Sequence, residues 1–254
     1  MRIDGSNIFL TGASSGIGAS LAGELVRRGA KVAGVSRRAV GGVTASISAD
    51  LAEPEERARA VREALEALGR IDILINNAGV GVYAPSWKTS LDDMRRMFEV
   101  NLFGAVDLTQ RLVPGMVERG GGMVVNVSSI AGKVPLPWFT LYSASKAALE
   151  AFTGGLRMEL HSTGVGAMLV CPGYVKTNFQ TSVLGGTPPA KLAHNKRFAS
   201  TAEAVARAVI EGMERGARTV MIPRVGWALV AAAGLAPGVV DGRLRAMMEG
   251  AGDS

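Results

Sequence analysis

Tyr142 and Lys146 are the residues of this sequence whose types and spacing most directly suggest chemistry. Residues four apart on a helix lie on one face, so the phenol and the ammonium can reach the same pocket. A phenol titrates near ~10, and a nearby cation favours its charged form and lowers that pKa. The pair could therefore pass a proton to or from an oxygen. A Tyr-x-x-x-Lys sequence also arises by chance in roughly one such chain in ten, so its meaning depends on its surroundings.

The composition indicates one well-packed soluble domain. The chain has 254 residues, 48% hydrophobic and 20% charged, and α/β folds of this length are often single domains. Cys171 is the only cysteine, so no internal disulfide can form and a reducing, cytoplasmic compartment is expected. The net charge is +6, but the arginines form no long basic block. We expect no nucleic-acid partner and see no secretory signal.

A glycine-rich turn near the N-terminus has the composition of a phosphate-binding loop. Residues 7–11 read as a buried strand, Gly12, Gly16 and Gly18 follow, and a helical pattern continues to Gly29, which can cap it. Glycines let the backbone approach a pyrophosphate, and the start of a helix supplies free N–H groups. The spacing differs from the common Gly-x-Gly-x-x-Gly fingerprint, and an ordinary strand-to-helix turn is the alternative.

The end of the next predicted strand indicates which nucleotide would bind. That strand covers residues 31–36, and Ser36, Arg37 and Arg38 stand at its end without a carboxylate. An acidic residue there would bind a ribose 2′-hydroxyl, whereas arginine suits a 2′-phosphate. NADP(H) is therefore favoured over NAD(H), although the arginines could simply form a solvated turn.

The rest of the sequence alternates strands and helices. Strands are expected at 43–48, 71–75, 123–127, 165–171 and 218–222, several of them continuous apolar runs typical of a parallel sheet. Helices are expected at 54–68, from Ser90 to beyond Leu112 with a kink near Pro114, from Tyr142 to about residue 162, and at 201–215. This order predicts an α/β fold, a Rossmann-type doubly wound parallel sheet in a three-layer α/β/α arrangement.

Several polar residues stand at strand ends or on apolar helix faces. Asn76 and Asn77 could hold loops or a ribose, or form a plain turn. Asn101 lies near the apolar stripe of its helix, and a buried amide needs partners. His161 and His194 lack a second ligand at suitable spacing, so no metal site is predicted.

Three segments are candidates for the part of the protein that contacts the substrate. Residues 178–200 have no clear periodicity, and so long a loop in a compact domain favours a substrate lid. Trp138 and Phe139 could line a substrate pocket or act as packing filler. Residues 225–240 are almost wholly apolar but shorter than the ~20 residues that span a bilayer. This segment could contact a membrane surface, but covering the pocket or packing against a partner chain is favoured.

Taken together, these motifs resemble those of the classical short-chain dehydrogenase/reductase family. The resemblance covers about residues 7–222, and Ser129 lies thirteen residues before Tyr142, as in the family pattern. Each motif alone is weak, but the set is specific. The motifs that occur in the family's order are residues 11–18, Asp50-Leu51, Asn76-Asn77-Ala78-Gly79, Asn101, Ser129, Tyr142-x-x-x-Lys146 and Pro172-Gly173.

The resemblance implies a role for each of these residues. Tyr142 would be the general acid/base, and Ser129 would hydrogen-bond the substrate oxygen. Lys146 would bind the nicotinamide ribose and lower the pKa of Tyr142. Asn101 would hold a water that links Lys146 to solvent. The cofactor-binding set would be Gly12, Ser14, Ser15, Gly16, Ile17, Gly18, Ser36, Arg37, Arg38, Asp50, Leu51, Asn77, Ala78, Gly79, Tyr142, Lys146, Pro172, Gly173, Val175 and Thr177.

The sequence therefore predicts an NADP(H)-dependent oxidoreductase that interconverts a carbonyl and an alcohol. One domain, 1–254, is expected, with a core at 7–222 and an apolar extension at 223–254. This extension suggests an apolar or lipid-like small-molecule substrate, and the small residues on the Tyr142 helix suggest a homodimer or homotetramer. A non-catalytic NADP-binding sensor or scaffold is the alternative class. A sugar-nucleotide epimerase or dehydratase is disfavoured because the chain is short for one.

Overall fold

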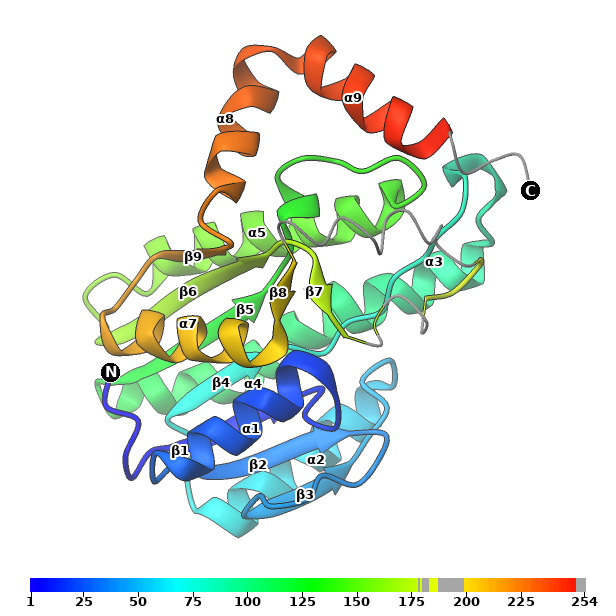
Figure 1. Ribbon diagram of the computed structural model, residues 1–254. Coiled ribbons are helices and arrows are strands. Elements are labelled where there is room, and N and C mark those ends of the chain that lie inside the picture. Colours follow the sequence, from blue (N-terminus) through cyan, green and yellow to red (C-terminus); the bar gives the residue numbers. More distant parts are fainter. Residues whose placement is uncertain (178, 180–182, 187–198, 250–254) are drawn as a thin grey trace.

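The computed structural model describes residues 1–177, 179, 183–186 and 199–249. Its centre is a seven-stranded sheet in the order β3-β2-β1-β4-β5-β6-β9, with every neighbouring pair parallel (Figure 1). The order reverses between β1 and β4, as in a doubly wound fold. The strands are β1 (Asn7–Thr11), β2 (Lys31–Ser36), β3 (Ala45–Ser48), β4 (Ile73–Asn76), β5 (Gly122–Val127), β6 (Val165–Pro172) and β9 (Thr219–Ile222).

Helices cover both faces of the sheet and bury two separate apolar clusters. On one face, α1 (Gly16–Arg27) and α7 (Ala202–Glu214) pack side by side over a cluster that includes Leu21 and Val209 (Figure 1). The other face is covered by α2 (Pro54–Leu68), α4 (Gly104–Glu118) and α5 (Thr140–Glu159). The strands are buried on both sides, which explains their continuous apolar runs. The predicted three-layer Rossmann-type fold is confirmed.

The helix expected from Ser90 to beyond Leu112 is interrupted. It consists of α3 (Leu91–Phe98), a π-helical turn at Glu99–Phe103, and α4. Pro114 lies inside α4, which continues to Glu118. The irregularity thus falls around Asn101, and π-helical turns occur frequently at functional sites.

Small elements complete the described part of the chain. Two strands that the sequence did not predict, β7 (Val175–Lys176) and β8 (Ser200–Thr201), pair in parallel. Short 3₁₀ turns occur at η1 (Ser86–Lys88) and η3 (Ile130–Gly132). Of the segment predicted as a lid, residues 178, 180–182 and 187–198 lie outside the described residues.

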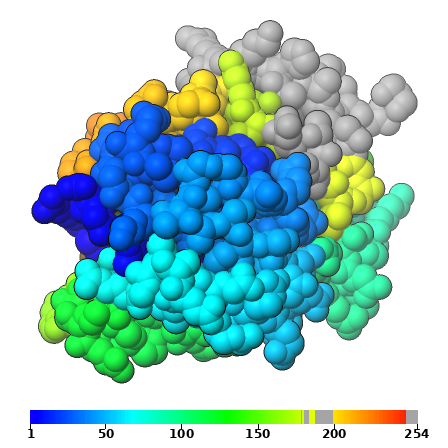
Figure 2. Space-filling model, turned by 90° about the horizontal axis from the view of Figure 1, so that it is seen from below, coloured from blue at the N-terminus to red at the C-terminus, as the bar shows by residue number. Residues whose placement is uncertain are grey.

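The apolar segment after Pro223 forms an arm of two helices, α8 (Gly226–Leu235) and α9 (Pro237–Glu249). In Figure 1 the arm arches over the upper end of the sheet, and much of it is exposed, with Trp227 at 45% and Leu235 at 87%. Figure 2 shows the molecule from below, on the side away from the arm, where blue and cyan segments from the first part of the chain form most of the surface. In the described part of the chain, no helix is long and apolar enough to cross a membrane.

Candidate active site

The sequence motifs gather at the carboxyl edge of the sheet. β1 ends before Gly12, β4 before Asn77, β5 before Ser128 and β6 before Gly173. Parallel strands bring their carboxyl ends to one edge, and ligands of doubly wound folds bind there. The fold therefore places together motifs that are far apart in the chain.

The turn between β1 and α1 requires glycine. Gly12 and Gly16 have positive φ angles of 65° and 53°, a conformation that favours glycine. A Cβ atom at Gly12 would lie 2.9 Å from Ala78 Cα, and one at Gly18 would collide with the Gly12 carbonyl oxygen. The Ser15 side chain, at the N-cap of α1, makes no capping hydrogen bond. A bare backbone and an uncapped helix start fit a phosphate group.

Asn77 fastens this turn to β4. Its Nδ2 donates to Thr11 O at 2.9 Å and to Gly12 O at 3.3 Å, and the Thr11 hydroxyl accepts from the N–H groups of Asn77 and Ala78, both at 2.9 Å. Of the alternatives left open for Asn77, loop fastening is the one its side chain performs here. Ser14 and Ile17 are half-buried in the same turn.

The end of β2 presents two exposed arginines. The Ser36 hydroxyl donates to Arg38 O and accepts from Arg38 N at 3.3 Å, which forms a tight turn. Arg37 and Arg38 are exposed. Within the described part of the chain, neither forms an ion pair. Two unpaired guanidinium groups suit an anionic ligand.

Asp50 has a partner that the sequence reasoning did not assign. Its Oδ2 pairs with Arg96 Nη2 at 2.6 Å, and its Oδ1 accepts from Ala52 N at 3.0 Å. Burial alone would raise the pKa of Asp50, but the Ala52 N–H and the Arg96 guanidinium lower it overall. Leu51 is buried, and its carbonyl oxygen accepts from Arg57 at 2.7 Å. Only folding could reveal Arg96, because it lies on a separate helix.

Tyr142 and Ser129 meet at the centre of the edge. Ser129 lies two residues after β5 ends, at the start of the η3 turn, and its hydroxyl interacts with the phenol of Tyr142 on α5. Burial raises the pKa of Tyr142 to about 12, and Ser129 opposes this rise. The expected lowering of this pKa by Lys146 is not seen. The physical reason is that the ring packs against Phe139 and Phe179, where loss of hydration disfavours the phenolate.

Lys146 is buried one helical turn beyond Tyr142. Its ammonium donates to Val127 O at 3.0 Å and lies 5.8 Å from the Tyr142 ring centroid. Burial lowers the pKa of Lys146 to about 8, against the opposing charge of Glu150. Gly79 leaves space here, because a Cβ atom on it would lie 3.3 Å from both the Lys146 ammonium and Asn101 Oδ1.

Asn101 is buried in the π-helical turn with its amide fully engaged. It accepts from Val80 N at 2.8 Å and donates to Val80 O at 2.9 Å and to Ser145 Oγ at 3.0 Å. Ser145 lies directly before Lys146. Asn101 therefore joins the loop after β4 to the helix that carries the Tyr142–Lys146 pair.

An aromatic cluster lines one side of Tyr142. Tyr83 stacks on Trp138 with centroids 5.5 Å apart, and it contacts Phe139 at 5.1 Å. Phe139 and Phe179 lie 6.0 Å and 5.6 Å from the Tyr142 ring. The sequence reasoning singled out Trp138 and Phe139 but missed Tyr83 and Phe179. In the sequence, Tyr83 and Phe179 are marked only by their places in segments that follow a strand. Such a place does not reveal that their rings come together beside Tyr142.

The remaining predicted residues lie around the glycine turn. A Cβ atom on Gly16 would lie 3.1 Å from Thr177 Cγ2, so Thr177 is against this turn. Val175 is half-buried on β7, Pro172 ends β6, and Gly173 N donates to Ile222 O at 2.7 Å.

The two histidines were not predicted as metal ligands. His161 is exposed beside Ser162, and His194 lies outside the described residues. Residues 1–177, 179, 183–186 and 199–249 hold no group of three or more His, Cys, Asp or Glu side chains able to bind a metal.

Comparison with known proteins identifies the class. The sequence profile of the family "short chain dehydrogenase" matches residues 6–186. The chain is 36% identical over 232 residues to the ketoacyl reductase HetN of Nostoc sp., which covers 87% of this chain and 79% of that protein. It is 33% identical over 233 residues to dehydrogenase/reductase SDR family member 7B of Mus musculus, covering 85% and 72%. The chain therefore belongs to the short-chain dehydrogenase/reductase family of oxidoreductases.

Solved structures agree with this assignment. A short chain dehydrogenase from Burkholderia cenocepacia in complex with NADP is 30% identical, with a TM-score of 0.80 over 96% of this chain and 99% of that one. A short chain dehydrogenase/reductase from Burkholderia phymatum in complex with NAD is 24% identical, with a TM-score of 0.82 over 94% and 96%. At that identity the second likeness shows the fold alone.

Proposed function

We propose that this protein is an NADP(H)-dependent oxidoreductase that interconverts a carbonyl and an alcohol, with Tyr142 as general acid/base. The observation that carries this proposal is the meeting of Tyr142, Ser129 and Lys146 at the edge where the glycine turn also opens. A phenol and a hydroxyl that converge beside a buried ammonium suit one substrate oxygen.

Each of the four polar residues has a defined task in reduction. The bound nicotinamide would supply the hydride. Tyr142 donates its proton to the carbonyl oxygen, and Ser129 donates a hydrogen bond to the same atom, where negative charge develops. Lys146 binds the ribose and offsets the charge left on the phenolate. The Asn101 side chain is already engaged, so its backbone carbonyl is the group that we propose holds the relay water.

Preference for NADP(H) rests on the exposed pair Arg37 and Arg38 at the end of β2. Two guanidinium groups without a carboxylate favour a 2′-phosphate. The relative from Burkholderia cenocepacia is described in complex with NADP, and the one from Burkholderia phymatum with NAD. The family thus contains both choices, and the arginines carry the argument for this chain.

The aromatic cluster beside Tyr142 supports an apolar or lipid-like substrate. Tyr83, Trp138, Phe139 and Phe179 supply an apolar wall next to the reacting phenol. The very-long-chain 3-oxoacyl-CoA reductase of Anas platyrhynchos is 37% identical over 190 residues, which covers 68% of this chain and 61% of that protein. With HetN it suggests 3-oxoacyl thioesters as the first compounds to try.

Oxidation of NADPH and NADH against a carbonyl panel tests this function. The panel should span small ketones, quinones, 3-oxoacyl thioesters and steroids, each with both cofactors. We expect NADPH oxidation with apolar carbonyls and at least about tenfold lower kcat/KM with NADH, which corresponds to about 1.4 kcal/mol. Equal rates with NADH would refute the cofactor assignment. A protein that binds NADPH but reduces no carbonyl would instead favour the sensor alternative.

The exposed arm and the outer face of α5 support a homodimer or homotetramer. Ala144, Ala147 and Ala151 are exposed small residues on α5, and the arm exposes Trp227 and Leu235. We propose that the arm packs against a second copy of the chain. A mass measurement by light scattering should show the oligomer. Flotation with anionic vesicles, which a flanking Arg224 and Arg243 would favour, tests peripheral membrane contact as the competing outcome.

A further inference from the structure

A largely shielded carboxylate, Glu150, lies behind the Tyr142–Lys146 pair and has no task in the proposed mechanism. Glu150 is one helical turn beyond Lys146 on α5, so the two side chains share a helix face. The Glu150 side chain is only 12% exposed, and its Oε2 pairs with Lys133 Nζ at 2.8 Å. Its Oε1 accepts from Ser128 Oγ at 2.9 Å and contacts Cys171 Sγ at 3.6 Å. A largely shielded carboxylate with this many partners is held in one place.

These contacts fasten the turn after Ser129 to the back of Lys146. The Ser128 hydroxyl is also 3.2 Å from Lys146 O. A Cβ atom on Gly132 would lie 2.6 Å from Glu150 Oε1 and 3.0 Å from Lys146 C, so the η3 turn packs flush against α5. The Lys133 ammonium also lies 5.6 Å from the Trp227 ring centroid, which connects the cluster to the base of the arm.

We propose that Glu150 is a positioning residue for the reaction: its carboxylate, with Lys133 as counter-ion, fixes the charge behind Lys146 and the place of the turn that follows Ser129. This rests on the proposed function.

The charges around Glu150 determine the sign of its effect. Lys133 faces it from the turn after η3, Lys146 from α5 and Cys171 from β6. The Cys171 thiol stays neutral because burial raises its pKa to about 12. Loss of the negative charge at Glu150 should lower the apparent pKa of the coupled Tyr142–Lys146 pair, and loss of the positive charge at Lys133 should raise it.

Two variants with opposite expected shifts test this inference. The pH profile of kcat with NADPH would be measured for Glu150→Gln and Lys133→Gln, with Glu159→Gln, an exposed change on the same helix, as matched control. We expect the apparent pKa of Glu150→Gln to fall by about half a unit or more, that of Lys133→Gln to rise, and the control to stay unchanged.

The outcomes separate this inference from the proposed function. Unshifted profiles in both active variants, or shifts in the same direction, would overturn the role of Glu150 and leave the function intact. A wild-type protein without carbonyl reduction would refute the function itself. If Glu150→Gln does not fold, the sign of the shift in Lys133→Gln decides.

A second inference comes independently from Asn76. Its Oδ1 is buried and has no hydrogen-bond partner among the described residues. The orientation of its amide is set by a chain of donors: Thr153 Oγ1 donates to Leu149 O and so accepts from Asn126 Nδ2 at 2.9 Å. Asn126 Oδ1 then accepts from Asn76 Nδ2 at 2.8 Å. The orphaned oxygen is thus fixed by the network, and a buried orphan acceptor is rare.

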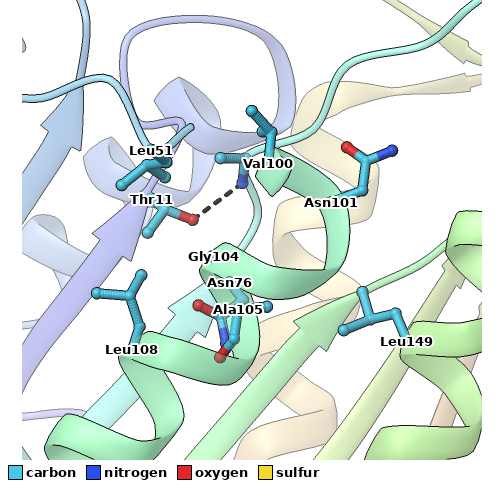
Figure 3. Close-up of a pocket in the computed structure, with 10 residues that line it drawn as sticks. Thr11, Leu51, Asn76, Val100, Asn101, Gly104, Ala105, Leu108 and Leu149 are labelled. Carbon is cyan, nitrogen blue, oxygen red and sulfur yellow. Dashed lines mark hydrogen bonds between the residues drawn. The ribbon is translucent and has the colours of Figure 1, made fainter. Parts of the chain in front are cut away.

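We infer that this oxygen binds one trapped water molecule. A cavity of about 10 Å³ adjoins Asn76 between β4 and the π-helical turn (Figure 3), and about 10–15 Å³ is the least that holds a water. The Thr11 hydroxyl and the Asn101 side chain line the same cavity but are already hydrogen-bonded, so backbone groups of the lining are the partners left for the water. The water would support the turn that carries Asn101 from behind.

A crystal structure at about 1.2 Å resolution tests the water site, since amide orientation and ordered water are then visible. We expect one ordered water within hydrogen-bond distance of Asn76 Oδ1, and its absence in Asn76→Leu. An empty cavity in the wild-type map, or an Asn76 amide that points its nitrogen into the cavity, would overturn the inference. The wild-type map alone decides if the variant does not fold.

Discussion

The nucleotide side and the reacting side of the carboxyl edge are built by opposite means. Around Gly12 and Gly18 the ligand surface is backbone, and added side-chain atoms would strike neighbouring main chain. Around Tyr142 and Lys146 the surface consists of polar side chains, one half-buried and one buried, whose pKa values are displaced by loss of water. The difference predicts that substitutions that add volume will disturb the nucleotide side most. Substitutions that remove a charge or a proton donor will disturb the reacting side most.

Removal of the Tyr142 hydroxyl should have the largest effect. Tyr142→Phe keeps the ring contacts with Phe139 and Phe179 but loses the proton donor, so kcat should fall by about 10²–10⁴-fold. Affinity for NADPH should remain within a few fold, measured by fluorescence titration. Substantial turnover by Tyr142→Phe would end the assignment of this residue as acid/base.

Lys146 should be required for turnover and yet lower the free energy of unfolding of the cofactor-free protein. Its folded pKa is about 8, below the ordinary 10.5, so protonation favours the unfolded chain. The free-energy cost of burying the charged ammonium is fully present below pH 8 and is relieved as the pH rises from 8 to 10.5. Lys146→Met should therefore abolish turnover yet raise the free energy of unfolding of the cofactor-free protein at pH 7 by about 1–3 kcal/mol.

Denaturant titrations at pH 7 and pH 10 measure this difference. The gain from Lys146→Met should shrink at the higher pH. Lys31→Met, an exposed change at the start of β2, is the control and should give no gain. A loss of stability in Lys146→Met at both pH values would contradict the assigned charge penalty.

A methyl group in the glycine turn should act through volume. In Gly18→Ala the Cβ atom meets Gly12 O and lies 2.6 Å from Asn77 Nδ2, so we expect a stability loss of about 1–3 kcal/mol together with weakened NADPH binding. Gly23→Ala on the same helix has no atom within 4 Å of its Cβ and should instead stabilise by about 0.5–1 kcal/mol. Equal effects of the two changes would show that the turn is not sterically limited.

The smallest effect should come from the exposed arginines. The double change Arg37→Ala and Arg38→Ala should raise KM for NADPH about tenfold and leave KM for NADH nearly unchanged. Salt should weaken NADPH binding in the wild type more than in the variant. Arg62→Ala, an exposed change on α2, is the matched control. Parallel loss of both cofactors would show that the arginines do not contact a 2′-phosphate.

Much of the fold could be predicted because its signals are local. The range predicted for β1 matches Asn7–Thr11, that for β2 matches Lys31–Ser36 and that for α2 matches Pro54–Leu68. Buried strands are recognised in a sequence by continuous apolar runs, and helices by the period of their apolar residues. The π-helical turn at Glu99–Phe103 could not be predicted in this way, since it depends on where the Asn101 amide finds partners.

The class of the protein can be inferred from the sequence alone, through the glycine turn, Ser129 and the Tyr142–Lys146 spacing. Their order in a parallel fold brings them to one edge whatever the details of packing. The pairing of Asp50 with Arg96 and the place of Glu150 behind Lys146 become visible only in the folded molecule. The tertiary structure also shows that burial outweighs the opposing hydrogen bond from Ser129 and so raises the pKa of Tyr142. These are effects of distance and hydration between separate elements, and a linear pattern carries neither.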